Sequence, residues 1–285
     1  MNRWPKISVV IVTRNRVANL KKTLDRVLED DYPNRELIVV DGASTDGTVQ
    51  LIKSYGAKIT RHLSEPDSGE YDAWNKAIGL VTGDIVKPLP DDDLLRPGSL
   101  RLAANYFSEH PETGILFGQS QIWDGRGGDL VHLKDTFCMD LGRTSLHHWL
   151  RQTHGLNSVA SFIRRDVYRQ IGPYRTDITA GDTEFWVRAA SRGVGFGLMP
   201  EVVVDYVVTG NNLEITRSFQ IAWDVVRINA TYGSAADVLY ALWQRRWTLS
   251  GYHELVGRAA RVSHSFGLHP RRAILQVMQR AGLRR

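Results

Sequence analysis

Three adjacent carboxylates, Asp91, Asp92 and Asp93, are the residues of this sequence with the clearest chemical potential. Neighbouring acids repel one another, so a folded protein must either solvate them or supply a counter-cation. Their oxygen atoms suit a hard divalent cation such as Mg²⁺ or Mn²⁺. The triplet therefore indicates either a solvated acidic turn or a metal site.

Two further acids stand where a pattern of secondary structure changes. Asp41 ends an apolar run, where it can accept hydrogen bonds from a ligand or cap its own loop. Asp182 precedes a helical pattern, where an N-cap contributes about 1 kcal/mol. Asp72, Asn75 and Lys76 share one face of an expected helix over 70–81, which fits a binding face or a solvated face.

The elements that must position these residues begin with the apolar, β-branched run 7–13, which is typical of a strand covered on both faces. An amphipathic helix and a second buried strand over 36–41 follow, which together make a βαβ unit. A third strand is expected over 58–63, and the acidic triplet ends a fourth. Ligands of open α/β sheets bind at such strand ends.

The link after the first strand, 14–16, contains no glycine. This argues against a dinucleotide-binding fold and against a phosphate-binding P-loop, since both need glycines there. The glycines follow the second strand instead, where Gly42 and the turn at Gly47 precede another helix. Thr45 or Asp46 is placed to cap that helix.

The second half of the chain is expected to hold strands over 114–118 and 159–164, with a hairpin or loop over 123–135. Residues 136–158 have an irregular pattern that fits a loop contacting sugar or phosphate, or an ordinary lid. A zinc site is not recognisable in their spacing. The aromatic and cationic residues of this segment are Arg143, His147, His148, Trp149, Arg151 and His154.

Composition limits the classes of protein to consider. The 285 residues are 42% hydrophobic and 24% charged, as in globular proteins, and no apolar run reaches the length of a membrane span. The start does not fit a signal peptide, and the single cysteine, Cys138, fits a reducing cytoplasm. We therefore expect a cytoplasmic protein.

Charge is distributed unevenly along the chain. The net charge is +5, but the segment after Glu254 contains seven arginines and no lysine or acid, which leaves −2 for residues 1–254. Two amphipathic helices are expected within 255–285, and a basic amphipathic helix either lies on an anionic membrane or packs on the protein. We expect no nucleic-acid partner.

Four motifs, taken in order, resemble family 2 glycosyltransferases with the GT-A fold. They are ISVVIVTRNR (7–16), ELIVVDGASTDGT (36–48), SEPDSGEYDAWNKAI (64–78) and GDIVKPLPDDD (83–93), and the resemblance extends over roughly residues 6–200. It implies a Rossmann-like αβα sandwich with a mainly parallel sheet, followed by a helical C-terminal extension. It also implies a nucleotide-sugar donor, Mg²⁺ or Mn²⁺, and inversion at the anomeric carbon.

The resemblance assigns roles to individual residues. Asp41 matches a residue that contacts the nucleobase, Asp91 and Asp93 match the metal-binding D-x-D, and Asp182 matches the general base. This sequence departs from the family at Arg14, where an aromatic residue is common, and at Gly181, where many relatives have Glu. The expected nucleotide-sugar-binding residues are Thr13, Arg14, Asn15, Asp41, Ser44, Asp72, Asn75, Lys76, Asp91 and Asp92.

The sequence thus predicts a catalytic domain over 1–208, with a donor half (1–115) and an acceptor half (116–208), and a basic helical extension over 209–285. The expected partners are a UDP-, GDP- or dTDP-sugar, a saccharide or lipid-linked acceptor of the cell envelope, and an anionic membrane for 255–285, at the inner face of the plasma membrane. A non-catalytic binding protein and a sugar-nucleotidyltransferase remain the alternatives.

Overall fold

The computed structural model describes residues 4–126, 129–136, 158–210, 212 and 216–249. The chain divides into two compact units, 1–212 and 213–285, and each is described by itself. Cys138, the aromatic and cationic residues of 143–154, and the basic segment 255–285 lie outside the described residues.

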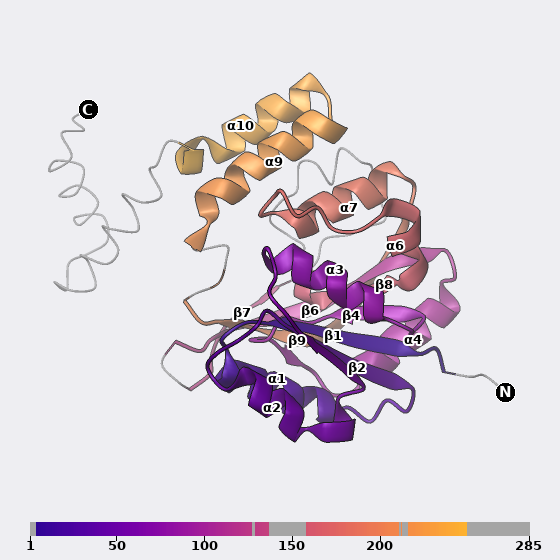
Figure 1. The fold of residues 1–285 in the computed structure, drawn as a ribbon. Coiled ribbons are helices and arrows are strands. Elements are labelled where there is room, and N and C mark those ends of the chain that lie inside the picture. Colours follow the sequence, from indigo (N-terminus) through magenta and orange to yellow (C-terminus); the bar gives the residue numbers. More distant parts are fainter. Residues whose placement is uncertain (1–3, 127–128, 137–157, 211, 213–215, 250–285) are drawn as a thin grey trace, which may run out of the picture. The chain divides into compact units, whose positions relative to one another are not determined.

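The described residues of the first unit form a sheet of nine strands in the order β3-β2-β1-β4-β8-β6-β9-β5, with β7 paired to β6 (Figure 1). The strands are β1 (Ile7–Thr13), β2 (Arg35–Asp41), β3 (Arg61–Ser64), β4 (Ile85–Pro88), β5 (Leu94–Leu95), β6 (Thr113–Asp124), β7 (Val131–Thr136), β8 (Ser161–Arg164) and β9 (Gly195–Val208).

The half of the sheet built from β1 to β4 is parallel, as expected for a βαβ fold. β1 is buried along its whole length, which explains its uninterrupted apolar sequence. Thr13 pairs with Asp41 at the ends of β1 and β2, and β4 runs parallel to β1 on its other side. The carboxyl ends of these strands therefore meet at one edge, which confirms the predicted α/β class.

The other half of the sheet is mixed. β8 runs antiparallel to both β4 and β6, whereas the long strands β6 and β9 are parallel to each other. β6 and β7 form the hairpin expected over 123–135. β6 extends well beyond the expected 114–118. The apolar pattern did not predict this extension because the last four residues of the strand are only half-buried.

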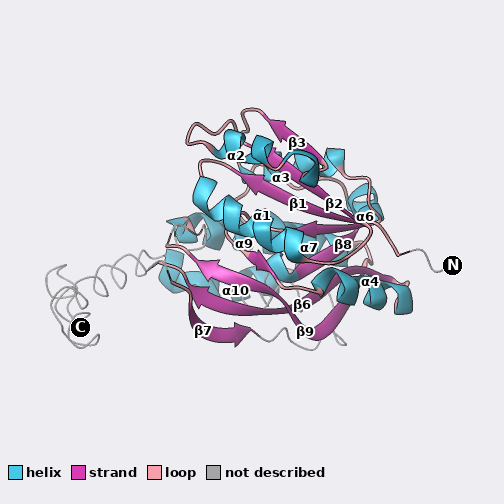
Figure 2. Ribbon diagram, turned by 90° about the horizontal axis from the view of Figure 1, so that it is seen from below, coloured by secondary structure: helices cyan, strands magenta, loops and turns pink. Residues whose placement is uncertain are grey.

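Helices cover both faces of the sheet in the first unit. One apolar cluster joins residues from β1, α1, α2 and α4, while α3, α6 and α7 lie on the opposite side of the sheet (Figures 1 and 2). The helices are α1 (Val17–Glu29), α2 (Thr48–Ser54), α3 (Glu70–Leu80), α4 (Ser99–Glu109), α6 (Arg165–Ile171) and α7 (Gly181–Ser191), with short 3₁₀ turns at Gly56–Lys58 and Ser158–Ala160.

Two helix starts differ in detail from the sequence prediction. Gly47 is the N-cap of α2, so the predicted N-cap role of Thr45 or Asp46 is wrong, although Asp46 accepts hydrogen bonds from the backbone N–H and the hydroxyl of Thr48, the first residue of the helix. Asp182 is the second residue of α7 and not its N-cap, a position that Ala180 occupies. The predicted N-cap role of Asp182 is therefore wrong, and its carboxylate instead bonds within the first turn.

The second unit contains two helices among its described residues, α9 (Ser218–Tyr232) and α10 (Ala235–Leu249). Val225 and Val226 of α9 pack with Ala241 of α10. This confirms the helical character expected after Gly210. None of the helices in the described part of the chain is both long enough and apolar enough to span a bilayer.

Candidate active site

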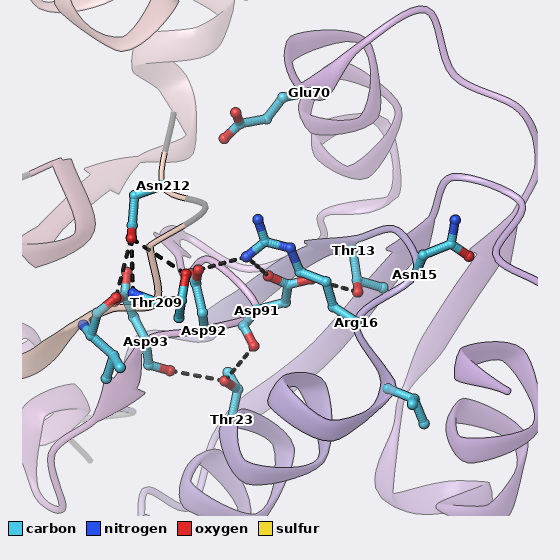
Figure 3. Close-up of polar contacts among 12 residues, drawn as sticks. Thr13, Asn15, Arg16, Thr23, Glu70, Asp91, Asp92, Asp93, Thr209 and Asn212 are labelled. Atoms are coloured by element: carbon cyan, nitrogen blue, oxygen red, sulfur yellow. Dashed lines mark hydrogen bonds and ion pairs between the residues drawn. The ribbon is translucent and has the colours of Figure 1, made fainter. Parts of the chain in front are cut away.

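The acidic triplet lies in the loop between β4 and β5, and the first turn of α1 faces it. Figure 3 shows Arg16 pointing at the triplet: its guanidinium lies 2.6 Å from Asp92 Oδ2 and 3.4 Å from Asp91 Oδ1. The second carboxylate oxygen of Asp91 accepts a hydrogen bond of 2.6 Å from the Thr13 hydroxyl. The end of β1 and the start of α1 thus supply both the donor and the cation that hold Asp91.

Burial changes the proton affinity of this cluster. Asp91 is almost fully buried, and burial raises its pKa to about 7 despite the hydrogen bond from Thr13 and the charge of Arg16. Burial would lower the pKa of Arg16, but the charges of Asp91 and Asp92 outweigh it and the pKa is raised. Arg16 therefore stays charged beside the two carboxyl groups.

Asp93 is turned toward the sheet. One of its oxygens accepts the backbone N–H of Val207 at 2.9 Å, while the other is buried and has no partner among the described residues. Burial, and then the charge of Asp92, raises the pKa of Asp93. Lys87 is the nearby cation: it is fully buried, donates to the carbonyls of Val159 and Ser161, and has a pKa lowered to about 7 by burial.

The backbone of the triplet is fixed from α1. The hydroxyl of Thr23, which is fully buried, lies 2.9 Å from the Asp91 carbonyl and 3.0 Å from the Asp93 carbonyl. Because one side chain holds both carbonyls, the loop keeps its shape although its three carboxylates repel one another.

A second polar cluster forms where β1 and β2 end. Asn15 and Ala43 both have positive φ, of 53° and 58°, which is uncommon for residues other than glycine. The Asn15 backbone N–H donates to Ser44 Oγ, and the Asn15 side-chain oxygen accepts the N–H of Thr45. These contacts join the two loops, and strained backbone of this kind is concentrated at ligand-binding sites.

Asp41 is fully buried in this second cluster. Its Oδ2 accepts hydrogen bonds from the Ser44 N–H and the Ser64 hydroxyl, while its Oδ1 is buried without a partner among the described residues. Asp41 therefore has the expected loop-capping role through Oδ2, while Oδ1 is an unpaired acceptor beside it. An unsatisfied buried oxygen costs about 1–3 kcal/mol unless a ligand supplies a donor.

Arg14 lies beside the same region. Its guanidinium is 3.7 Å from Asp67 and remains largely exposed. The Asp67 carboxylate packs directly against Gly42, where an added Cβ would approach it to 2.1 Å. A side chain at position 42 would therefore have to displace the Asp67 carboxylate.

The predicted binding residues of α3 make contacts within the protein. Asp72 accepts the Ser68 N–H, and Lys76 bonds to the Pro66 carbonyl and pairs with Glu65 and Asp72, so both hold the loop before α3. Asn75 donates to the Tyr174 carbonyl and accepts its N–H, each at 2.9 Å. A role of these three residues in donor binding stays a prediction.

Asp182 lies at the start of α7, and α3 contacts it. The Tyr71 hydroxyl accepts the Asp182 backbone N–H at 3.1 Å and lies 3.5 Å from Asp182 Oδ1. Oδ1 also accepts the Thr183 N–H at 2.6 Å. Among the described residues no donor contacts Oδ2, so this half-buried carboxylate has one fixed oxygen and one available oxygen.

Glu70 connects the two acidic regions. Its carboxylate accepts a hydrogen bond from the Trp74 indole, and the protein around it raises its pKa by desolvation, with further contributions from Asp182 and Asp92. Because Glu70 feels both charges, Asp182 and the triplet face the same region, where Figure 3 shows Glu70 across from Arg16. No pattern in the sequence indicates a site role for Arg16, Thr23, Glu70, Tyr71 or Lys87.

Asp41 and the acidic triplet lie at or just after the carboxyl ends of the parallel strands β2 and β4, together with the strained loops at Asn15 and Ala43. Residues 8–172 match the family model described as glycosyl transferase family 2. The chain belongs to this family. The match includes both loop clusters and all of α3, and it ends before α7.

Relatives and solved structures agree with this family assignment. A PGL/p-HBAD biosynthesis glycosyltransferase of Mycobacterium bovis is 28% identical over 196 residues, which are 66% of this chain and 70% of that one. The mannosyltransferase PcManGT of Pyrobaculum calidifontis, solved with GDP-Man and Mn²⁺, has a TM-score of 0.64 at 21% identity, covering 100% of this chain and 82% of that one.

The fragment 1–349 of S. aureus TarS, solved with UDP-GlcNAc, has a TM-score of 0.63 at 17% identity and covers 86% and 73%. In the longer S. aureus TarS structure, the matched region is 44% of that chain. At these identities the structural matches establish the fold, which is the GT-A fold expected from the sequence.

Proposed function

We propose that this protein is an inverting glycosyltransferase that moves a sugar from a nucleoside-diphosphate donor to a hydroxyl acceptor. The observation that carries the proposal is the state of Asp182, whose Oδ1 accepts the Thr183 backbone N–H and faces the Tyr71 hydroxyl, while no described residue contacts Oδ2. A general base needs an oxygen within hydrogen-bond reach of the hydroxyl that it deprotonates. Family membership supports the same reaction.

The donor is proposed to bind across the two loop clusters. Asp41 Oδ1 offers a buried acceptor for an N–H of the nucleobase, and Arg14 lies beside it with an exposed planar guanidinium. The diphosphate would then extend toward Thr13, Arg16 and the acidic triplet. Arg16 is suited to this contact because a guanidinium binds phosphate oxygens in a bidentate manner.

The residues present fit a divalent cation held by Asp91 and Asp93. Asp93 keeps a buried carboxylate oxygen without a partner among the described residues, and the triplet supplies hard oxygen ligands. The described residues contain no cluster of three or more potential ligands, but Mg²⁺ is usually held by one or two carboxylates together with substrate phosphates. Such an ion would neutralise the diphosphate and make it a better leaving group.

The acceptor is proposed to be a glycan or lipid-linked saccharide of the cell envelope. The mycobacterial relative is named for PGL/p-HBAD biosynthesis, which supports an envelope acceptor. The seven arginines after Glu254 support a contact with an anionic membrane that would carry such an acceptor.

Donor binding can be tested by thermal shift. We expect one of UDP, GDP, dTDP or CDP, or one of their sugars, to stabilise the protein strongly and to do so only with Mn²⁺, since a ligand at 100 times its Kd adds about 2.7 kcal/mol. Stabilisation by none of them, with and without Mn²⁺, would contradict the proposed donor class.

The role of Asp182 can be tested with Asp182→Asn. Loss of a general base should lower turnover by about 10²–10⁴-fold while the thermal shift caused by the donor stays close to that of the wild type. Release of nucleoside diphosphate from the donor that the thermal-shift panel selects is the measurement. Turnover near the wild-type rate would exclude Asp182 as the base.

A further inference from the structure

Gly181, the first residue of α7, contacts the ring of Tyr71. A Cβ added at Gly181 would lie 2.7–2.8 Å from three carbons of that ring, closer than real Cβ contacts allow. Gly181 has no positive φ, so its backbone does not require glycine. The ring of Tyr71 therefore takes the space that any side chain at the start of α7 would need.

With its ring packed against Gly181, Tyr71 has its hydroxyl next to Asp182 at the start of α7. The first N–H groups of a helix have no partner within the helix. The Tyr71 hydroxyl accepts a hydrogen bond from one of them, the backbone N–H of Asp182. The same oxygen lies 3.5 Å from Asp182 Oδ1, so its hydrogen is directed at that carboxylate. The Tyr71 hydroxyl thus contacts both the backbone and the side chain of Asp182, the predicted base.

Tyr71 is itself held in place. Its ring packs on Tyr174 with centroids 5.6 Å apart, and Tyr174 packs on Phe185 of α7 at 4.5 Å. Asn75, one turn further along α3, bonds to both backbone groups of Tyr174. Burial raises the pKa of Tyr71 well above its usual value, so the hydroxyl keeps its proton.

We propose that Tyr71 is a positioning residue for Asp182: its hydroxyl fixes the backbone and Oδ1 of the base, so that Oδ2 is presented to the acceptor, and Gly181 provides the space for its ring. This inference depends on the proposed function, because it assigns Tyr71 a role through the base. It connects α3, whose sequence motif lies in the donor half, to the catalytic carboxylate in the other half.

The test compares Tyr71→Phe with a matched control, Tyr168→Phe. Tyr168 lies in the same aromatic cluster and its hydroxyl bonds to that of Tyr174 at 3.2 Å, but it does not contact Asp182. Misplacing a catalytic group by about 1 Å can cost about 10²-fold, so we expect Tyr71→Phe to lower kcat by about 10- to 100-fold with the KM for the donor changed by less than about threefold. Tyr168→Phe should keep kcat within about threefold of the wild type.

Hydrogen exchange of the full-length protein gives a readout that does not depend on activity. Tyr71→Phe should speed exchange of the Asp182 amide, because its acceptor is lost, whereas Tyr168→Phe should not. Unchanged exchange at Asp182, or unchanged kcat, in Tyr71→Phe would overturn the inference.

Gly181→Ala is a second variant, which disturbs Tyr71 without changing it. The added methyl should displace the Tyr71 ring and reproduce the loss in kcat, and it should cause no further loss when combined with Tyr71→Ala. Additive losses in the double variant would overturn the role of Gly181.

A combined variant separates this inference from the proposed function. If Tyr71 acts through Asp182, adding Tyr71→Phe to Asp182→Asn should leave the residual rate unchanged, because residues that act as a unit are not additive. A further drop would overturn the inference alone. Full activity of Asp182→Asn would instead contradict the proposed function.

Discussion

The two carboxylate oxygens of Asp41 differ: one is held by the protein and the other is unpaired among the described residues. Its Oδ2 is held by Ser44 and Ser64, and its Oδ1 is buried without a partner among the described residues. In Asp41→Asn the amide oxygen would take over the contacts of Oδ2, which leaves an NH₂ donor where we propose that a donor of the nucleotide binds.

We therefore expect Asp41→Asn to weaken nucleotide binding by about 10- to 100-fold, since a hydrogen bond to a charged group contributes about 1.5–3 kcal/mol. The measurement is isothermal titration with the nucleotide that stabilises the wild type. Ser64→Ala is the control, because it removes a donor to Oδ2 and leaves Oδ1 as it is. Equal affinity of Asp41→Asn and the wild type would contradict a role of Oδ1 in binding.

At this scale the sequence revealed acids at strand ends but not their partners. Asp41 and Asp91 were identifiable because each follows a buried strand. Arg16 was not, because its ion pairs join residues 75 and 76 positions apart and leave no local pattern. Tyr71 was hidden for the same reason: its contact with Asp182 spans 111 positions.

Helix α3 connects the loop before it to the segment that precedes α7. Asp72 and Lys76 hold the loop, while Asn75 bonds to both backbone groups of Tyr174. The sequence placed these three residues on one face of a helix, and the structure gives this face two different tasks. Periodicity predicts the face of a helix but not the segment that packs against it.

Asn75→Ala should therefore destabilise the protein rather than weaken donor binding. Two part-buried hydrogen bonds are lost, so we expect the free energy of unfolding to fall by about 1–3 kcal/mol. Thermal denaturation measures this loss, and the shift produced by the stabilising nucleotide should keep its wild-type size. Lys76→Ala, whose ion pairs are exposed, should change the melting temperature less. An unchanged melting temperature with a lost nucleotide shift would instead assign Asn75 to the donor site.

Among the strands, too, the apolar pattern predicts some boundaries and not others. β1 and β2 match their expected ranges closely because both faces of each are buried. β5, a strand of two residues, was not predicted, because its pairing with β9 is set by contacts 109 or more positions away. The boundaries that failed are those fixed by distant partners.

Across the whole first unit, one buried carboxylate far from the acidic triplet joins β1, β2 and the start of β4. Glu36 is 1% exposed and accepts hydrogen bonds from Ser8, Thr82 and Gly83, with Lys6 at 2.8 Å. Burial alone would raise its pKa, but the hydrogen bonds from Lys6, Ser8 and Thr82 outweigh burial and lower the pKa from 4.5 to about 2.

This shift predicts how stability depends on pH. The folded state binds fewer protons than the unfolded state between the two pKa values, so Glu36 stabilises the protein fully above pH 4.5 and loses this contribution as the pH falls to about 2. Glu36→Gln should flatten this acid slope and lower stability at neutral pH, as measured by urea unfolding at a series of pH values. Glu29→Gln, which removes an exposed acid of α1, should keep the slope. A Glu36→Gln slope identical to that of the wild type would refute the assignment.

Arg16 has a consequence for the order in which ligands associate. In the free protein this residue already contacts the carboxyl groups of Asp91 and Asp92. A cation that comes alone would compete with the guanidinium, whereas a diphosphate gives the guanidinium a new partner and releases the carboxylates. Nucleotide and metal should therefore each bind more tightly in the presence of the other, by the same factor, as thermodynamic linkage requires. A protein built this way would hold little metal between turnovers and take up the ion together with its donor.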